Sequence, residues 1–285
     1  MNKVYIRFPC FKLKAVTLSY DDGVRQDKRL ISIMQKYGLK GTFNINAGIF
    51  SDKNEGKEKG RMSKQEALGL YIPSGMEVAI HGYRHFSLAS IATNLAINDI
   101  VSDRKALENL FGRVITGMAY ANGSYSEEII ELLHKVGIRW ARLAGESEKF
   151  DLPTNWLAWQ GTCHHDNPRL MDLAKEFVEQ KEHWYYWNRE LKIFYLWGHS
   201  YEFDDHNNWE RIEGFAEYMG GRNDIWYATN GEIFEYLQAC DRLEFSMDGS
   251  FVKNPSGIDV YLDYLGRKCI IPAGKTVRMD NGGIL

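Results

Sequence analysis

Short apolar runs alternate with longer amphipathic runs over most of the chain, and this alternation constrains the fold more than any other feature. An apolar run bounded by turn residues predicts a buried strand, whereas apolar residues recurring every three or four positions predict a helix. The runs predicted as strands are residues 15–20, 41–46, 76–80, 114–120, 138–141, 156–160, 193–197 and 225–229. The segments predicted as helices are residues 28–37, 63–70, 97–111, 126–136, 168–181, 208–219 and 231–240.

Strand and helix in steady alternation predict parallel strands joined by right-handed crossovers. About seven or eight such units close more naturally into a barrel than into an open sheet. An open doubly wound sheet is the alternative, but no Gly-x-Gly-x-x-Gly sequence follows the first strand to support a dinucleotide site. We therefore expect an α/β barrel.

The pattern changes after residue 241. Residues 245–285 contain short alternating runs separated by Gly, Asn and Pro, which are typical of β-hairpins. We therefore assign residues 1–241 to the barrel and residues 242–285 to a small β appendage that caps it. The lysine-rich stretch 52–61 is predicted to be a solvated loop at the barrel rim.

Composition limits the class of protein and its partners. With 285 residues, 44% hydrophobic and 26% charged, the chain has the make-up of a soluble globular protein. Lys and Arg total 35 against 38 Asp and Glu, so the net charge of −3 offers no basic footprint for nucleic acid. No apolar run approaches the ~20 residues of a membrane span, so we expect no membrane partner.

The beginning of the chain and the cysteines bear on the compartment. Lys3, Arg7 and Pro9 interrupt residues 1–11, which therefore lack the apolar segment of a signal peptide. The four cysteines contain no Cys-x-x-Cys pair, which predicts free thiols rather than a zinc knuckle. Both features favour a cytoplasmic protein.

Two polar clusters follow predicted strands. Asp21 and Asp22 are adjacent carboxylates after an apolar run, and such a pair is costly unless something uses both charges, because like charges raise each other's pKa. His81 and His85 are four residues apart, and on a helical turn two such side chains can face one ion. Peptidase zinc sites place a Glu after the first His, and Gly82 stands there instead.

Both clusters lie at the carboxyl ends of predicted parallel strands, which is the face where barrel enzymes build their sites. One carboxylate and two imidazoles leave room for water on a divalent ion, as in a catalytic zinc-type site. The second carboxylate is then free to act as a base.

Three segments resemble the motifs of a known family. Residues 17–23 (TLSYDDG) resemble the first motif of the polysaccharide deacetylase family, also called the NodB homology domain or carbohydrate esterase family 4. Residues 81–85 (HGYRH) resemble its His-x-x-x-His motif, and residues 196–199 (LWGH) resemble the late motif that supplies a catalytic histidine. The resemblance spans roughly residues 14–240.

The resemblance implies a distorted (β/α)7-type barrel and a set of roles. Asp21 would be the base that takes a proton from a metal-bound water, and His199 would be the acid that protonates the leaving amine. Asp22, His81 and His85 would hold one divalent metal ion. Zinc suits these ligands best, and cobalt or nickel would also suit them.

Two motifs of the family are altered. The third motif is usually Arg-x-Pro-aromatic-Gly, but Ala119 stands in place of the arginine and Ala121 in place of the proline. That arginine normally orients the base. Arg142, just past the next predicted strand, is the candidate to supply the charge instead, and the alternative is that Arg142 is a surface residue. For the acidic residue that tunes the catalytic histidine, Asp166 and Glu202 are candidates.

From these features we expect a metal-dependent hydrolase that removes acetyl groups from N-acetylated, or O-acetylated, sugars or oligosaccharides. We expect Tyr120, Asn122, Trp197 and His164 to contact the carbohydrate, while a metal role for His164 is the weaker alternative. A catalytically inactive carbohydrate-binding barrel is the competing function, because the third motif is altered. A metal-dependent isomerase or lyase would require more carboxylate ligands at strand ends. The sequence makes no prediction about the specific glycan or the oligomeric state.

Overall fold

A single parallel sheet forms the centre of the computed structural model, which describes residues 4–51, 60–180, 190–279 and 283. Its strands run in the order β7-β6-β5-β4-β3-β2-β9-β8, and β10 pairs with the start of β2. The strands are β2 (Lys14–Asp21), β3 (Gly41–Ile45), β4 (Glu77–Ile80), β5 (Gly117–Ala119), β6 (Trp140–Glu146), β7 (Trp159–Gly161), β8 (Cys163–His164), β9 (Lys192–Gly198) and β10 (Ile225–Tyr227).

The sheet closes on itself through β7 and β8. These two strands are successive pieces of one segment, of which β7 pairs with β6 and β8 pairs with β9. Between them, the backbone N–H of Thr162 donates to the carbonyl of Tyr195 at 2.8 Å. Because β9 also pairs with β2, the ring runs from β2 through β3 to β6, across the β7–β8 segment and back through β9. This arrangement confirms the predicted (β/α)7-type barrel.

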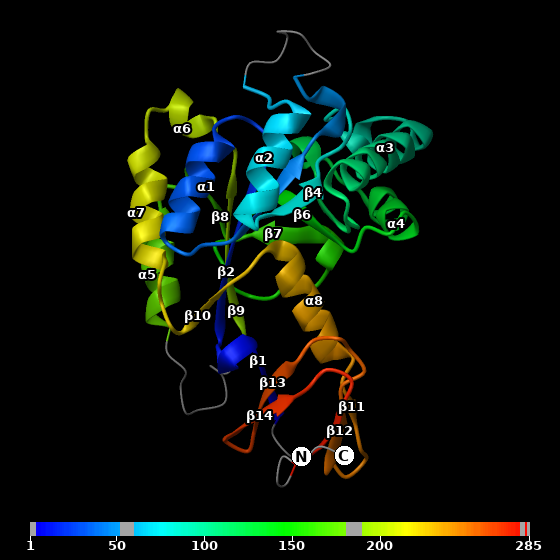
Figure 1. Cartoon of the computed structure of the whole chain (residues 1–285), viewed down its shortest axis with the longest axis vertical. Helices are drawn as coiled ribbons and strands as arrows, with labels where there is room; N and C mark the ends of the chain where they lie inside the picture. Colours follow the sequence, from blue (N-terminus) through cyan, green and yellow to red (C-terminus); the bar gives the residue numbers. More distant parts are fainter. Residues whose placement is uncertain (1–3, 52–59, 181–189, 280–282, 284–285) are drawn as a thin grey trace.

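Helices cover the outside of the barrel (Figure 1). They are α1 (Asp27–Lys36), α2 (Lys64–Ser74), α3 (Thr93–Phe111), α4 (Glu127–Lys135), α5 (Leu170–Glu179), α6 (Glu202–Asp205), α7 (Trp209–Met219) and α8 (Asn230–Asp241). Short 3₁₀ turns occupy Pro9–Phe11, Ala47–Ile49, Leu88–Ser90, Ala121–Gly123 and Trp156–Ala158. Every predicted helix overlaps one of these helices, whereas the short α6 was not predicted.

Local chemistry explains where α2 begins and ends. The Ser63 hydroxyl accepts the backbone N–H of Glu66 at 3.1 Å, and the Glu66 carboxylate accepts the backbone N–H of Ser63 at 2.7 Å. This reciprocal capping box satisfies two amide groups that the helix start would otherwise leave unpaired. Gly75 then ends the helix with a φ of 71°, a left-handed conformation that glycine adopts without steric cost.

The core lies on both faces of the sheet. All eight residues of β2 are buried, because helices cover its outer face and side chains of the other strands cover its inner face. Along the strand the apolar side chains of Val16, Leu18 and Tyr20 alternate with the hydroxyls of Thr17 and Ser19, which are buried in hydrogen bonds with Asn230 and Asn44. All four cysteines carry free thiols, as predicted.

The C-terminal strands form two small antiparallel sheets at the base of the barrel, where Figure 1 also shows both termini. These strands are β11 (Glu244–Phe245), β12 (Phe251–Lys253), β13 (Val260–Tyr264), β14 (Arg267–Ile271) and β15 (Thr276–Arg278). The N-terminal strand β1 (Val4–Arg7) joins one sheet by pairing with β13, with Val4 opposite Tyr264. The chain's first strand therefore packs with the appendage, although the division at residue 241 itself stays a prediction.

The appendage shares a core with the barrel base and α8. Val260 and Leu262 of β13 lie in the same buried cluster as Ile233 and Leu237 of α8. The Tyr236 hydroxyl donates to the carbonyl of Arg7 and accepts the backbone N–H of Tyr261 at 3.1 Å. These contacts fit the capping role expected from the sequence.

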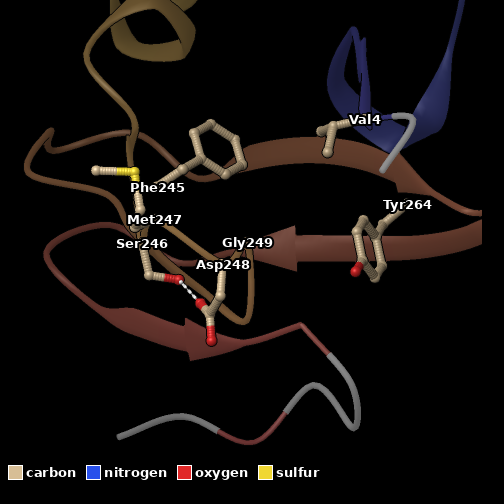
Figure 2. Close-up of a pocket in the computed structure, with 7 residues that line it drawn as sticks. All are labelled: Val4, Phe245, Ser246, Met247, Asp248, Gly249 and Tyr264. Atoms are coloured by element: carbon tan, nitrogen blue, oxygen red, sulfur yellow. Dashed lines mark hydrogen bonds between the residues drawn. The ribbon is translucent and has the colours of Figure 1, made fainter. Parts of the chain in front are cut away.

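A hollow of about 540 Å³ lies on the appendage, away from the carboxyl ends of the barrel strands (Figure 2). Its lining residues are Val4, Phe245, Ser246, Met247, Asp248, Gly249 and Tyr264. Asp248 accepts hydrogen bonds from the hydroxyls of Ser246 and Ser250, each at 2.7 Å. The carboxylate therefore stabilises the turn in which it lies. Within the described ranges, no helix is both long and apolar enough to span a membrane.

Candidate active site

The first polar cluster lies where β2 ends. Asp21 is the last residue of β2, and the chain turns directly after it, with a φ of 84° at Asp22 and 65° at Gly23. A side chain at position 23 would collide with Ile45, since a Cβ there would lie 2.9 Å from its Cγ2 atom. The turn points the two neighbouring carboxylates at different partners, which separates their charges.

The second cluster follows β4 and is a loop rather than the expected helical turn. Gly82 has a φ of 82° and His85 a φ of 58°, so the backbone reverses between the two histidines. The loop is held by α3: the carboxylate of Asp103 accepts the backbone N–H of His81 at 3.0 Å, and that of Asp99 accepts the backbone N–H of Arg84 at 3.0 Å. The imidazole rings of His81 and His85 consequently lie 4.9 Å apart between centroids.

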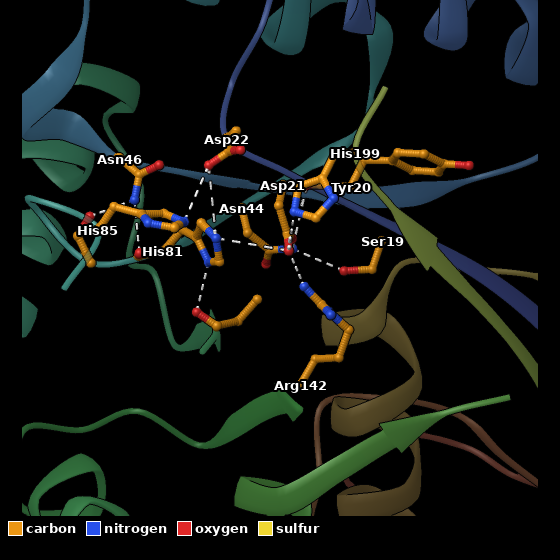
Figure 3. A network of polar contacts seen from close by, with 12 residues as sticks. Ser19, Tyr20, Asp21, Asp22, Asn44, Asn46, His81, His85, Arg142 and His199 are labelled. Atoms are coloured by element: carbon orange, nitrogen blue, oxygen red, sulfur yellow. Dashed lines mark hydrogen bonds and ion pairs between the residues drawn. The ribbon is translucent and has the colours of Figure 1, made fainter. Parts of the chain in front are cut away.

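Asp22, His81 and His85 converge on one point (Figure 3). Asp22 Oδ1 lies 3.5 Å from His85 Nε2 and 3.9 Å from His81 Nε2, and the three donor atoms lie within 4.8 Å of one another. His81 Nδ1 lies 2.8 Å from the carbonyl oxygen of Ala119, an acceptor, which fixes the proton on Nδ1 and leaves Nε2 as a ligand. This donor set fits a divalent cation.

Arg61 contacts the candidate metal site, and the sequence analysis missed it. Its guanidinium donates to Asp22 Oδ1 at 3.0 Å, to the Asp22 carbonyl, and to Asn46 Oδ1 at 2.9 Å. The prediction placed it in a solvated loop over residues 52–61, of which 52–59 lie outside the described residues. A backbone bridge between Val24 and Arg61 brings this arginine to the site.

Asp21 lies at the centre of the network in Figure 3 and is buried. Its Oδ1 accepts the amide of Asn44 at 2.8 Å, and its Oδ2 is paired with the guanidinium of Arg142. His81 Nε2 and His199 Nε2 lie 3.8 and 3.9 Å from the same Oδ2. Burial raises the pKa of Asp21, but Arg142, His81 and His199 outweigh it and hold that pKa well below its usual range.

Arg142 takes the place of the altered third motif. It lies in β6, directly opposite Ala119 of β5 in the register of the two strands, and it is fully buried. Its guanidinium carbon lies 4.6 Å from the ring centroid of Trp197, which adds a cation–π contact to the ion pair with Asp21.

His199 follows β9 and faces two carboxylates. Its Nε2 lies 3.9 Å from Asp21 Oδ2, and its Nδ1 lies 3.3 Å from Glu202 Oε2. Burial lowers the pKa of His199, but the contact with Glu202 and the charge of Asp21 raise it above its ordinary value overall. Of the two acidic candidates, Glu202 therefore contacts His199, whereas Asp166 is paired with His206 Nδ1 at 3.0 Å.

Comparison with known proteins decides the family. Residues 9–141 match the family model described as polysaccharide deacetylase. This part of the chain belongs to the polysaccharide deacetylase family. A search of curated proteins found no match.

Solved structures support the same fold. A protein of Mycobacterium smegmatis described as a putative polysaccharide deacetylase is 15% identical with a TM-score of 0.59, and the match covers 85% of this chain and 96% of that one. The allantoinase PuuE is 11% identical with a TM-score of 0.58, covering 80% and 91% of the two chains. The match to the Streptococcus pyogenes deacetylase PplD, 16% identical with a TM-score of 0.41, covers 45% of this chain and 55% of that one.

The structure separates the four residues predicted to contact carbohydrate. Trp197 and His164 line a hollow of about 450 Å³, and Asn122 is exposed in the turn after β5. Tyr120 does not fit the prediction, because its side chain is buried and its hydroxyl donates to the carbonyl of Leu157 at 2.8 Å. The β5 segment turns this side chain towards the core.

Asn44 in β3 and Asn46 directly after this strand were also missed. Asn44 donates to Asp21 and to the hydroxyl of Ser19 at 2.9 Å, while Asn46 donates to the carbonyls of His81 and Gly82 at 2.7 and 2.6 Å. Both asparagines are buried. Their signal in the sequence is the pair of amides at alternate positions near the end of an otherwise apolar strand.

Proposed function

We propose that the protein removes acetyl groups from N-acetylated sugars or oligosaccharides by hydrolysis, and that O-acetyl esters are also within its reach. The observation that carries the proposal is the grouping of a metal-type ligand set, an ionised Asp21 and His199 at one end of the barrel. His81 Nε2 of the ligand set and His199 Nε2 lie 3.8 and 3.9 Å from Asp21 Oδ2, so the metal-type site, the base and the acid adjoin one carboxylate, as a base and an acid acting on one bond require.

Asp22, His81 and His85 would hold one divalent ion, with zinc favoured and cobalt or nickel also suited to two imidazoles and a carboxylate. When bound there, such an ion would polarise the acetyl carbonyl and acidify water. The carbonyl of Ala119 orients His81 for this role, and Arg61 holds Asp22.

Asp21 would accept a proton from the attacking water. Its low pKa keeps it ionised at neutral pH, and Asn44 and Arg142 each hold one of its oxygens. Two fixed oxygens leave the carboxylate little freedom to rotate, so its remaining lone pairs stay directed into the site.

His199 would protonate the departing nitrogen, because an amine leaves poorly without a proton. Glu202 and Asp21 favour the protonated imidazole, so the proton is available near neutral pH. The backbone N–H of Tyr120 already donates to the carbonyl of Arg142 at 3.0 Å. Another N–H of the turn over residues 121–123 would therefore have to stabilise the oxyanion.

The inactive carbohydrate-binding barrel is less well supported. The argument for it was the lost arginine of the third motif, and the ion pair of Arg142 with Asp21 supplies that charge from the neighbouring strand. We propose a soluble acetylated carbohydrate in the cytoplasm as the partner, without nucleic acid or membrane.

An acetate-release screen tests the proposal. The protein is stripped of metal, supplied with Zn²⁺, Co²⁺ or Ni²⁺, and given small N-acetyl and O-acetyl sugars, with Asp21→Asn as the matched inactive control. We expect metal-dependent acetate release that this variant lacks. Binding of the sugars without acetate release under any condition would favour the binding barrel instead.

A further inference from the structure

A second cluster of titratable side chains lies beside the candidate active site. Glu202 Oε2 is 3.2 Å from His164 Nε2, 3.3 Å from His165 Nε2 and 3.3 Å from His199 Nδ1. Three imidazoles thus surround one carboxylate oxygen, and of these three only His199 also faces Asp21.

The spacing of this cluster is that of a metal site, but its hydrogen bonding is not. The donor atoms of His164, His165 and Glu202 lie within 4.8 Å of one another. However, His164 Nδ1 accepts the backbone N–H of Asp166 at 3.1 Å, so in the neutral ring the proton must be on Nε2. A ligating histidine shows the opposite pattern, as His81 does when its Nδ1 faces the carbonyl of Ala119.

The orientation of His164 is fixed on several sides. Besides the bond from Asp166, its backbone N–H donates to Glu146 Oε1 at 3.1 Å. Its ring packs edge-on against Trp197, with 4.6 Å between centroids. With the ring held in this way, its Nε2 lies 3.2 Å from Glu202 Oε2, a distance at which the Nε2–H can donate a hydrogen bond to that oxygen.

Glu202 receives several such contacts at once. The backbone N–H of His199 donates to Oε2 at 3.0 Å, in addition to the imidazole contacts. Burial raises the pKa of Glu202, but hydrogen bonds from His164 and His199 lower it well below its usual range. The carboxylate is therefore ionised and held in one place.

His165 closes the back of the cluster. It is fully buried, and its ring stacks on Phe203 with 4.1 Å between centroids. Burial lowers the pKa of His165 to about 3, so the ring is neutral and adds no charge against Glu202. Water is thus excluded behind the carboxylate, and the charged contact to His199 is strengthened.

We infer that His164 is a positioning residue, which donates to Glu202 and thereby holds that carboxylate against His199. The inference rests on the proposed role of His199 as the acid. In this role His164 acts on the substrate nitrogen through Glu202 and His199. The sequence analysis had instead expected His164 to contact the sugar directly. Without its hydrogen bond, Glu202 can rotate away and the imidazole of His199 loses its fixed orientation.

Three variants test this inference in the metal-loaded protein. His164→Ala removes the donor, His164→Gln restores an N–H on a side chain of similar reach, and His206→Ala is the control, because His206 contacts Asp166 and is half exposed. We expect His164→Ala to lose on the order of 10-fold or more in kcat on an N-acetyl sugar. It should keep its activity on a nitrophenyl acetate, whose leaving group needs no proton. His164→Gln should recover most of the loss, and His206→Ala should match the parent protein.

A double-mutant cycle shows whether His164 works through Glu202. If it does, Glu202→Gln and the pair Glu202→Gln/His164→Ala should be equally slow on the amide, because the second change removes nothing further. Additive losses, or equal losses on amide and ester, would overturn the inference and return His164 to direct substrate contact.

Metal titration provides a readout independent of activity. We expect one equivalent of Zn²⁺ per chain in the parent protein and in His164→Ala alike. A second equivalent that His164→Ala abolishes would overturn the inference in favour of a metal site. If the parent protein releases no acetate from any substrate, the proposed function fails. An active parent with an unaltered His164→Ala variant overturns only the role of His164.

Discussion

Arg142 stands directly opposite Ala119 in the register of β5 and β6, and its guanidinium pairs with the carboxylate of Asp21. Neighbouring positions on adjacent strands present their side chains at nearly the same place in a barrel. A positive charge lost from the end of one strand can therefore be supplied from the next without moving the backbone. This relationship makes Arg142 the residue on which the state of Asp21 depends most.

We predict that Arg142→Ala lowers kcat on an acetylated sugar on the order of 10²-fold while changing KM little, because orienting a base matters mainly in the transition state. The change also leaves the buried carboxylate of Asp21 without its cation, at a cost of about 3–5 kcal/mol in the free energy of unfolding. Steady-state kinetics and urea unfolding measure the two effects. Parent-like kinetics in a folded variant would remove Arg142 from the site.

Replacing any one of Asp22, His81 and His85 by Ala should weaken binding of Zn²⁺ at least ~10-fold, since each supplies one donor atom. Isothermal titration calorimetry of the metal-stripped proteins measures the affinity. His134→Ala serves as a control, because His134 lies in the last turn of α4. Undiminished affinity in both the His81 and His85 variants would place the metal elsewhere.

The two neighbouring aspartates should behave differently. Asp21→Asn should retain Zn²⁺ and lose about 10²- to 10⁴-fold in rate, because it removes a base and not a ligand. Asp22→Asn should lose metal first, and excess metal should restore part of its activity. Metal content after dialysis, measured together with the rate, separates these cases, and the reverse pattern would exchange the two roles.

His199→Ala should abolish most activity on amides while sparing a nitrophenyl acetate, and bound metal should be unaffected. Cleavage of the amide needs a proton on the nitrogen, whereas nitrophenolate leaves as an anion. Parallel assays of both substrates, with metal analysis, decide the matter. An equal loss on both substrates would leave His199 without an acid role.

Asp27 predicts a pH dependence of stability. It is buried, and although the hydroxyls of Ser200 and Tyr71 donate to it, burial raises its pKa to about 7. The folded protein therefore binds this proton more tightly than the unfolded chain, so the contribution of Asp27 to stability is fully present at low pH. This contribution of Asp27 to the free energy of unfolding should fall as pH rises from about 4 to about 7, by up to about 4 kcal/mol, whereas Asp21 and Glu202, whose pKa values are lowered, contribute in the opposite sense at lower pH.

Urea unfolding of the parent protein and of Asp27→Asn at pH 5 and pH 8 tests this dependence. The parent should lose more stability between the two pH values than the variant, whose side chain does not titrate. Equal losses in the two proteins would show that Asp27 is not the group responsible.

The ends of β2, β4 and β9 were predicted to within one residue, because apolar runs mark buried strands and the polar residues after them share one face of a barrel. The end of β6 was not, since this strand runs to Glu146 and contains Arg142, which was expected just past an end at residue 141. The same reasoning predicts the position of Arg142, since strand order places it beside the third motif. The geometry of His81 and His85 could not be predicted from the sequence, because a spacing of four residues fits a loop with left-handed residues as well as a helical turn.

Other features depend on contacts between distant segments. Arg61 reaches Asp22 only because the backbone at residues 60–62 pairs with the turn after β2, through bonds such as Met62 N–H to the carbonyl of Gly23 at 3.1 Å. The burial of Tyr120 follows from its bond to Leu157, which no local pattern reveals. Pairings of this kind are set by tertiary packing.

The pairing of β1 with β13 has a consequence for synthesis of the protein. Val4 emerges from the ribosome before the barrel strands, whereas its partner Tyr264 follows only after the whole barrel has been made. The barrel strands can assemble in order as they appear, but β1 must remain unpaired until β13 is released. Closure of the base is thus a late event, which occurs after the end carrying Asp21 and His81 has been synthesised. In a nascent chain halted before β13, the end of the barrel that carries Asp21 and His81 could form while β1 at the base still lacked its partner strand.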